Sequence, residues 1–205
     1  MASDRIRKGR KFEQVLDGAR RIFLRDGFEG ASVDDIAREA GVSKATLYSY
    51  FPDKRLLFME VAKTECRRQS DEAIEVIDQT APPRVVLRAA AERIIAFMAS
   101  DFGQGIFRIC VAESDRFPAL GHEFYHSGPL LVRERLVGYL TAAVAQGQLV
   151  IDDLELAADQ FAELCKADIH ARLIFGVGEC CNPRDTERVI NGAIEMFMAR
   201  YGARP

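Results

Sequence analysis

The sequence predicts an all-helical protein, and two observations support this fold class. Apolar residues recur at the 3.6-residue spacing of one helix face along almost the whole chain. Neither the strict apolar–polar alternation of a strand nor an Asn-Gly hairpin signal is found in the sequence. Glycines and prolines divide the helical pattern into separate segments. We therefore expect a series of helices joined by short turns.

The first helix is predicted over residues 5–26. Its apolar stripe consists of Phe12, Val15, Leu16, Ala19, Ile22 and Phe23. Gly27 is expected to end this helix, since glycine favours the conformation found just after a helix. Two short helices are predicted next, within the stretch ASVDDIAREAGVSKATLYSYF. Pro52 then opens a long helix over residues 53–79.

The second part of the chain is predicted to be a larger set of helices. Pro82 and Pro83 interrupt the pattern, and a largely buried helix is expected from Val86 to about Ser100. Further helices are predicted over residues 104–114, 117–127, 130–146, 153–175 and 186–201. Because the long helix 53–79 links the two parts, we expect an N-terminal domain over residues 1–55 and a helical domain over residues 56–205.

Composition and charge limit the class of protein to which this sequence can belong. Hydrophobic residues make up 48% of the chain and charged residues 29%, which is typical of a soluble globular protein and excludes a disordered one. Residues 1–70 hold 15 lysines and arginines against 11 acidic residues, whereas the rest hold 13 against 20. A basic N-terminal part on an acidic body is typical of a protein that meets phosphate at one end only.

The N-terminal sequence and the cysteines indicate a cytoplasmic protein. MASDRIRKGRKFEQ has no apolar signal-peptide core, and eighteen consecutive apolar residues occur nowhere, so no membrane span is predicted. Five cysteines in such a chain are expected to be reduced. Cys66, Cys110 and Cys165 fall in apolar helical patterns and are predicted as core residues. Cys180 and Cys181 lie in a predicted loop, where oxidant sensing is an alternative interpretation.

The stretch from Ser32 to Phe51 predicts a helix-turn-helix. Ser32 and Ser43 are each placed to cap a short helix, and Asp35 can complete the first cap. Gly41 supplies the turn between the helices. The shared core is predicted to be Val33, Ile36, Ala37, Val42, Leu47 and Phe51. This motif presents its second helix to the major groove of DNA.

The second short helix is predicted to carry a DNA-reading surface. With Leu47 and Phe51 facing inward, the outward residues are Lys44, Ala45, Thr46, Tyr48, Ser49 and Tyr50. Lys44 can donate to guanine, Ala45 permits close approach, and Tyr48 can contact a thymine methyl or a base edge. The residues placed for contacts with phosphate are Ser32, Ser49, Tyr50 and Lys54.

These residues carry a family resemblance. The stretch ARRIFLRDGFEGASVDDIAREAGVSKATLYSYFPDKRLLF resembles the N-terminal DNA-binding domain of the TetR family of bacterial transcriptional regulators. The stretches VAESDRFPALGHEFYHSGP and QFAELCKADIHARLIFG resemble the AefR-like subset of C-terminal regulatory domains. The resemblance implies that the helix beginning at Ser43 is the recognition helix. Position 50 is tyrosine where relatives often have histidine, and position 49 is serine where a bulkier aromatic is frequent.

A homodimer on a near-palindromic operator is expected, because one recognition helix reads only a few base pairs. The candidate dimer helices are the last two, with the apolar residues Leu156, Phe161, Leu164, Ile169, Leu173, Val189, Ile190, Ala193, Ile194, Phe197 and Met198. The alternative is that some of these residues pack inside their own subunit. In the TetR family these helices pair into a four-helix bundle, so the resemblance supports the dimer.

The acidic body is larger than a dimerisation domain requires, so we expect a pocket for an unknown small-molecule effector there. By resemblance it lies among the helices between residues 83 and 175. The candidate lining is Phe97, Phe102, Phe107, Phe124 and Tyr139, with His122 or His170 as a polar group. The predicted function is a repressor whose effector favours a form with altered half-site spacing, transmitted through residues 53–79.

One motif favours a different class of protein. His122, Glu123 and His126 satisfy the H-E-x-x-H pattern of zinc hydrolases, in which two histidines bind the metal and the glutamate is the general base. Gly128 and Pro129 truncate this helix, and a third ligand is missing at the spacing such enzymes use. The histidines are instead expected on the outer face of a regulatory-domain helix, with Phe117, Leu120, Phe124 and Tyr125 packing inward. We therefore predict no enzyme, no metal and no cofactor.

Overall fold

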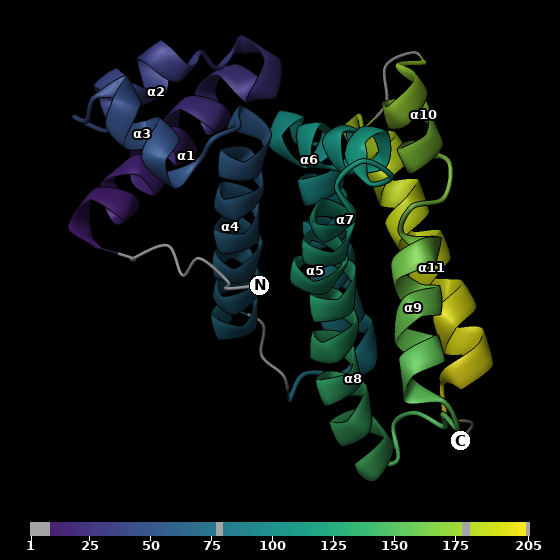
Figure 1. The fold of residues 1–205 in the computed structure, drawn as a ribbon. Helices are drawn as coiled ribbons and strands as arrows, with labels where there is room; N and C mark the ends of the chain where they lie inside the picture. Colours follow the sequence, from purple (N-terminus) through teal and green to yellow (C-terminus); the bar gives the residue numbers. More distant parts are fainter. Residues whose placement is uncertain (1–8, 77–79, 178–180, 204–205) are drawn as a thin grey trace. The chain divides into compact units, whose positions relative to one another are not determined.

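The computed structural model describes residues 9–76, 80–177 and 181–203, and it is helical throughout (Figure 1). Apart from one isolated bridge between Leu149 and Gly202, the described chain contains no strand. The predicted all-helical class is therefore confirmed. The start of the first predicted helix, the end of the helix predicted over residues 53–79, the side chain of Cys66 and Cys180 lie outside what the structure describes. By their contacts the helices form two compact units, Met1–Glu65 with Asp101–Phe124, and Cys66–Ser100 with Tyr125–Pro205.

The N-terminal unit contains α1 (Arg10–Gly30), α2 (Val33–Glu39), α3 (Lys44–Tyr50), the first part of α4 (Lys54–Val76), α6 (Asp101–Glu113) and the first part of α7 (Pro118–Ser127). Five of the six residues of the predicted α1 stripe are at most 2% exposed, namely Phe12, Val15, Ala19, Ile22 and Phe23, whereas Leu16 is half-buried. Phe58 of α4 contacts the rings of both Phe23 and Phe102. α1 and α4 thus surround an aromatic core that also holds α6.

Two glycines of α1 shape this unit. Gly27 has φ of 69° and ψ of −178°, so its backbone is not helical and it interrupts the helix where the sequence predicts an end; α1 continues beyond this kink to Gly30. Gly18 is buried where α1 meets α2, and a Cβ atom at this position would lie 2.7 Å from the Cα atom of Ala40. The absence of a side chain at Gly18 is what allows the two helices to approach.

The C-terminal unit contains α5 (Pro83–Ala99), α8 (Pro129–Ala145), α9 (Leu154–Leu164), α10 (Ile169–Phe175) and α11 (Pro183–Tyr201). Leu87, Leu140, Phe161, Ile169 and Phe197 are at most 1% exposed and form the middle of its core. Two ion pairs join α5 to α11, from Arg84 to Glu195 and from Arg88 to Glu187. This unit is a helical bundle around a continuous apolar core.

The single helix predicted over residues 153–175 is wrong, since α9 ends at Leu164 and α10 begins at Ile169. Asp168 lies between them with φ of 63°, a left-handed conformation that aspartate tolerates better than most residues. Its carboxylate forms ion pairs with Arg188 of α11 and, at 3.7 Å, with Arg172. The apolar pattern runs through the break because Phe161, Cys165, Ile169 and Leu173 remain buried on both sides of it.

Most residues predicted to pair two subunits pack inside one subunit, as the alternative interpretation held. Eight residues of that set belong to the buried core: Phe161, Ile169, Leu173, Val189, Ile190, Ala193, Ile194 and Phe197. Leu164 and Met198 pack against this core, whereas Leu156 is 50% exposed. The apolar surface of the last helices therefore serves first as core.

The inner face predicted for the helix at 117–127 is only partly right. Leu120 is buried, whereas Phe117 and Phe124 are half-buried. Tyr125 is 43% exposed, so its predicted inward position is wrong.

Among the described residues no single helix is long and apolar enough to cross a membrane; α5 and α6 meet that criterion only when taken together.

Candidate nucleic-acid interface

The helix-turn-helix begins with two capped helices. Ser32 Oγ accepts a hydrogen bond from the Asp35 amide at 3.0 Å and donates to the Asp35 carboxylate at 2.5 Å. Ser43 Oγ accepts from the Thr46 amide at 3.1 Å and starts α3. Gly41, with φ of 64°, makes the turn between α2 and α3. These short helices depend on their caps, because seven-residue helices hold few internal hydrogen bonds.

The inner face of α3 is anchored by buried side chains. Leu47 is 1% exposed and Phe51 is 5% exposed, which confirms their predicted inward positions. The Phe51 ring stacks on Phe12 of α1 at 5.3 Å between ring centroids. The Tyr50 ring meets Phe12 edge-on at 5.7 Å. α3 is thus fixed on α1 by aromatic packing.

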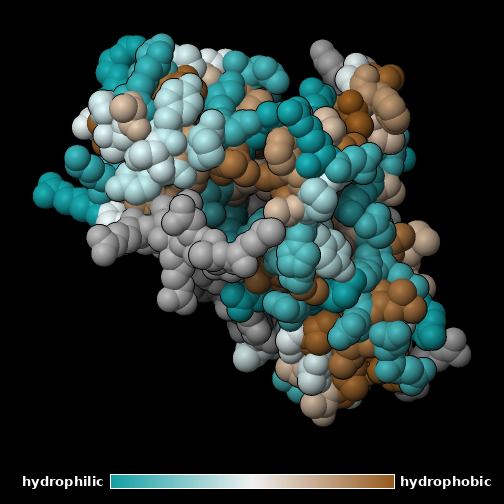
Figure 2. Space-filling view, viewed as in Figure 1, coloured by the Kyte–Doolittle hydropathy of each residue, from teal (hydrophilic) through white to brown (hydrophobic). Residues whose placement is uncertain are grey.

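The outer face of α3 is polar and exposed. The exposed side chains are Lys44, Ala45, Tyr48 and Ser49, and Tyr48 is 47% exposed. Thr46 and Tyr50 are half-buried. Figure 2 shows hydrophilic to neutral side chains over the region of α2 and α3, at the upper left. An exposed amine and phenol on a fixed helix are suited to base edges, although contact with DNA stays a prediction for each of these residues.

Lys44 has a partner that sequence reasoning missed. Its Nζ lies 2.7 Å from Oδ1 of Asp34 on α2. This hydrogen bond raises the pKa of Lys44 above its ordinary value. Asp34 belongs to the acidic start of α2, but it lies ten positions before Lys44 and on the other side of the turn, so helical spacing gives no signal for the pair.

The residues predicted to contact phosphate have local partners. Ser49 Oγ donates to the Thr46 carbonyl at 2.6 Å. Lys54 Nζ donates to the carbonyls of Phe28 and Ala31 at 2.8 and 3.0 Å, and lies 4.3 Å from the centroid of the Phe28 ring. The ammonium of Lys54 therefore ties α4 to the connection between α1 and α2. Its contact with phosphate stays a prediction and competes with this structural role.

An ion-pair network holds the first turn of α4. Arg55 pairs with Asp53 at 2.6 Å and with Glu113 of α6 at 2.7 Å. Hydrogen bonds to these two carboxylates raise the pKa of Arg55, and the hydrogen bond from Arg55 lowers the pKa of Asp53. The Arg55 guanidinium also lies over the ring of Phe117. The end of α6 is thus held by Arg55, four residues beyond the helix-turn-helix.

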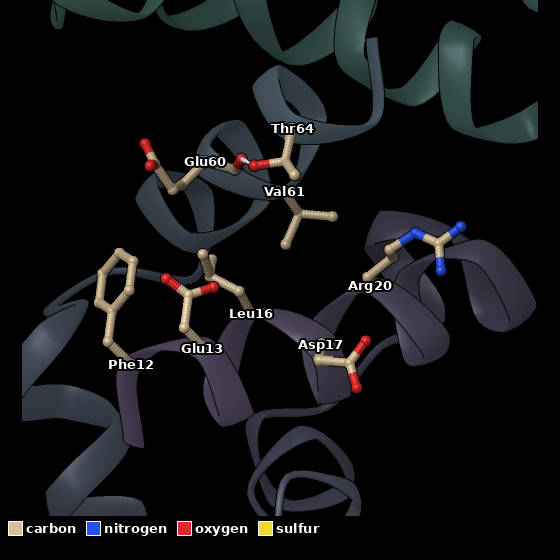
Figure 3. Close-up of a pocket in the computed structure, with 8 residues that line it drawn as sticks. All are labelled: Phe12, Glu13, Leu16, Asp17, Arg20, Glu60, Val61 and Thr64. Carbon is tan, nitrogen blue, oxygen red and sulfur yellow. Dashed lines mark hydrogen bonds between the residues drawn. The ribbon is translucent and has the colours of Figure 1, made fainter. Parts of the chain in front are cut away.

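A shallow groove of about 200 Å³ lies between α1 and α4 (Figure 3). Its lining consists of Phe12, Glu13, Leu16, Asp17, Arg20, Glu60, Val61 and Thr64. Leu16 and Val61 face each other across it. Arg20 pairs at 2.7 Å with Glu65, whose side chain is 2% exposed. The groove contains none of the predicted effector-binding residues.

Those predicted effector-binding residues are divided between the two units. In the N-terminal unit, Phe102 is buried against Phe58, and Phe107 contacts Phe124 at 6.3 Å between ring centroids, while His122 is exposed. In the C-terminal unit, Phe97 and His170 are half-buried, and the buried Tyr139 donates its hydroxyl to the Ala81 carbonyl at 3.1 Å. Burial lowers the pKa of His170. The effector site therefore stays a prediction.

The motif of a zinc hydrolase is not assembled into a metal site. Glu123, the expected general base, forms an ion pair with Lys63 at 2.6 Å. Within the described part of the chain, no three histidine, cysteine or acidic side chains are grouped so that they could hold a metal ion.

The buried thiols of Cys110 and Cys165 are poorly suited to reaction as thiolates. Burial raises the pKa of Cys110 to about 11 and that of Cys165 to about 12. Cys181 is half-buried.

Comparison with known families covers most of the chain. Residues 15–61 match the model described as bacterial regulatory proteins, tetR family. Residues 85–203 match the AefR-like transcriptional repressor, C-terminal domain. Both matches confirm the resemblance predicted from the sequence. They concern transcriptional regulators, so the prediction that the chain is not an enzyme is confirmed, and the hydrolase and redox-sensor alternatives gain no support.

Individual relatives agree with these matches. The repressor AcnR of Corynebacterium efficiens is 33% identical over 63 residues, which are 31% of this chain and 34% of that protein. The chain therefore spans about a third of the length of this curated relative. A solved regulator from Mesorhizobium loti has a TM-score of 0.80 and 26% identity, covering 96% of this chain and 98% of the other. The flavonoid-responsive regulator FrrA has a TM-score of 0.72 and 34% identity, covering 96% and 100%.

Proposed function

We propose that this chain, which belongs to the TetR family of bacterial transcriptional regulators, is a cytoplasmic repressor that binds a near-palindromic operator as a homodimer and leaves it when an effector binds. The observation that carries this proposal is the separation of buried and exposed side chains on α3. Its inner residues Leu47 and Phe51 are buried, while Lys44, Ala45 and Tyr48 are exposed on the opposite side. A capped helix with such an outer face fits the major groove.

The proposed DNA-binding residues keep the roles derived from the sequence. Lys44, Ala45, Thr46 and Tyr48 would meet base edges, and Ser43 would hold the start of the helix. Ser32, Ser49, Tyr50 and Lys54 would meet the backbone. The domain boundary at residue 55 is proposed as a division by function, because Asp101–Phe124 pack with the N-terminal unit.

The proposed dimer uses the exposed sides of α9 and α11. Leu156 of α9 is 50% exposed and Met196 of α11 is 62% exposed, so both remain available after the core is filled. Gly192 lies one turn before Met196 and has no atom within 4 Å of its Cβ direction, which would let a partner helix approach closely. Figure 2 shows hydrophobic side chains on the lower part of the C-terminal unit. The assignment is tested by sedimentation of Met196→Glu, which should be monomeric while remaining folded.

The proposed effector is a small aromatic molecule. This rests on the 34% identity to FrrA, which is described as flavonoid-responsive, and on the aromatic residues Phe97, Phe107, Phe124 and Tyr139 in the regulatory part. Rings of this kind pack against flat apolar ligands. A flavone should weaken operator binding, whereas a saturated fatty acid should leave it unchanged. A flavone that binds the protein without affecting the operator complex would contradict this part of the proposal.

The direct test of DNA binding is selection from a randomised duplex pool. The wild-type protein should enrich an inverted repeat, and the complex should weaken as salt is raised because phosphate contacts release counterions. Lys44→Ala should change which sequences are enriched, because Lys44 is assigned to a base. Arg38→Ala on the exposed side of α2 serves as a matched control for the loss of one cation, and it should keep the sequence preference. Failure to retain any duplex at low salt would contradict the proposed function.

A further inference from the structure

The ion pair between Asp34 and Lys44 lies on the proposed DNA-binding surface. In the α3 sequence KATLYSY, Lys44 is the one basic residue. Its ammonium is 2.7 Å from the Asp34 carboxylate, and the two side chains are 52% and 65% exposed. The pair joins the first turn of α2 to the first turn of α3. Any base edge that Lys44 reaches is therefore within a few ångströms of a carboxylate.

Capping of α2 does not explain this carboxylate. Ser32 and Asp35 form the cap, and Asp35 is also paired with Arg38 at 2.5 Å. Asp34 instead adds a negative charge to a surface that must approach phosphates. On electrostatic grounds alone this charge weakens binding to every duplex equally. Its position beside the only cation of α3 indicates a different role.

We infer that Asp34 is a specificity-determining residue, which together with Lys44 reads one G·C base pair in each half-site. This inference rests on the proposed function. The ammonium donates to guanine O6 or N7, and the carboxylate accepts from the N4 amino group of the paired cytosine. In the major groove these groups lie side by side on one base pair, as the two side chains lie side by side on the protein.

The same pair limits binding to other sequences. A lysine without an acidic partner can bind any nearby phosphate, and the phosphates are the same at every DNA sequence. With Asp34 present, Lys44 is held toward the groove, and the carboxylate is repelled by the duplex unless a cytosine amino group meets it. Asp34 thus lowers affinity for DNA in general and restores it at the matching base pair, which raises the ratio between operator and other DNA.

Selection from a randomised duplex pool tests the inference, with wild type, Asp34→Asn and Asp17→Asn compared. Asp17 is a matched control because it is 62% exposed, lies in the same unit and pairs with a different cation, Arg21. The wild type and Asp17→Asn should enrich a repeat with a fixed G·C pair. Asp34→Asn should lose that preference and bind the unselected pool roughly threefold to fivefold more tightly per half-site, as expected for an exposed ion pair. Asp34→Glu should retain the preference.

A double-mutant comparison separates the pair from simple charge. In a Lys44→Ala background, Asp34→Asn should change both the enriched sequences and the affinity for the unselected pool less than it does in the wild-type background, because one half of the pair is already lost. If Asp34→Asn tightens binding to the unselected pool equally in both backgrounds, the carboxylate acts by charge alone and the inference is overturned. A wild-type repeat that Asp34→Asn also selects, with the same G·C pair, overturns it while the proposed function stands. If the wild type enriches no sequence, the proposed function fails and the inference fails with it.

Discussion

α3 and α11 begin in the same way and differ in what they do with their side chains. Each starts at a polar cap, Ser43 for α3 and Asn182 for α11. α3 has 7 residues and buries one of them, Leu47, so most of its side chains face outward. α11 has 19 residues and buries an apolar row from Val189 to Tyr201. The comparison teaches that α3 is held by its neighbours and presents a surface, whereas α11 is part of what holds its unit together.

The largest effect is expected in the row of α11. Phe197 is 1% exposed and contacts the rings of Phe161 and Tyr201 at 5.4 and 4.9 Å. Phe197→Ala should lower the free energy of unfolding by about 3–5 kcal/mol, because it removes these contacts and leaves a cavity. Urea unfolding measures the change. The control Arg184→Ala, at an exposed position in the first turn of the same helix, should stay within about 0.5 kcal/mol. A Phe197→Ala protein of unchanged stability that is monomeric would return this residue to the dimer interface.

A smaller loss is expected for the anchor of α3. Leu47→Ala should lower the free energy of unfolding by about 2–5 kcal/mol and abolish operator binding, because the helix loses its buried side chain. Tyr48→Ala, one residue away and exposed, should change stability by no more than about 0.5 kcal/mol and still weaken operator binding. Unfolding and DNA titration are measured on the same samples. Equal stability losses for the two variants would mean that α3 has no inner and outer face.

Substitution of Lys54 distinguishes a structural role of this residue from a contact with phosphate. Lys54→Met should lower the free energy of unfolding by about 1–3 kcal/mol, because the carbonyls of Phe28 and Ala31 lose a charged donor. Lys44→Met, at an exposed position, should leave stability almost unchanged and alter DNA binding instead. If Lys54→Met leaves stability unchanged and weakens binding to all duplexes alike, the phosphate contact predicted from the sequence is right.

The smallest effects concern the two caps and sharpen the comparison most directly. Ser43→Ala and Asn182→Ala should each cost about 1 kcal/mol, because each removes one acceptor for an orphan helix amide. Only Ser43→Ala should reduce operator affinity, since α3 must be formed to present its outer face. A reduction of similar size for Asn182→Ala would show that the stability of the C-terminal unit itself controls DNA binding.

The sequence predicted the helix-turn-helix well because its determinants are local. The caps at Ser32 and Ser43, the turn at Gly41 and the spacing of Leu47 and Phe51 all act within a few residues, and the structure confirms each of them. The ion pair of Lys44 with Asp34 and the bonds of Lys54 to distant carbonyls could not be predicted. They depend on how separate helices meet, and helical spacing carries no information about that.

The C-terminal unit was predicted less completely for a related reason. An apolar helix face shows that something covers it, but not whether the cover is the same chain or a second one. The apolar row from Val189 to Phe197 is therefore compatible with either a dimer interface or a core, and the structure places it in the core. The break at Asp168 was missed because the buried residues on either side, Cys165 and Ile169, keep the spacing of an uninterrupted helix.

The absence of a side chain at Gly18 limits how the helix-turn-helix can vary. Because α2 packs directly against the α1 backbone at Gly18, even a methyl group at this position would displace α2, and α3 with it, from α1. Every amino acid that touches a base could remain in place and the protein could still fail to match its operator, since two half-sites tolerate little displacement. The orientation of α3 on the protein therefore depends on residue 18 having no Cβ atom.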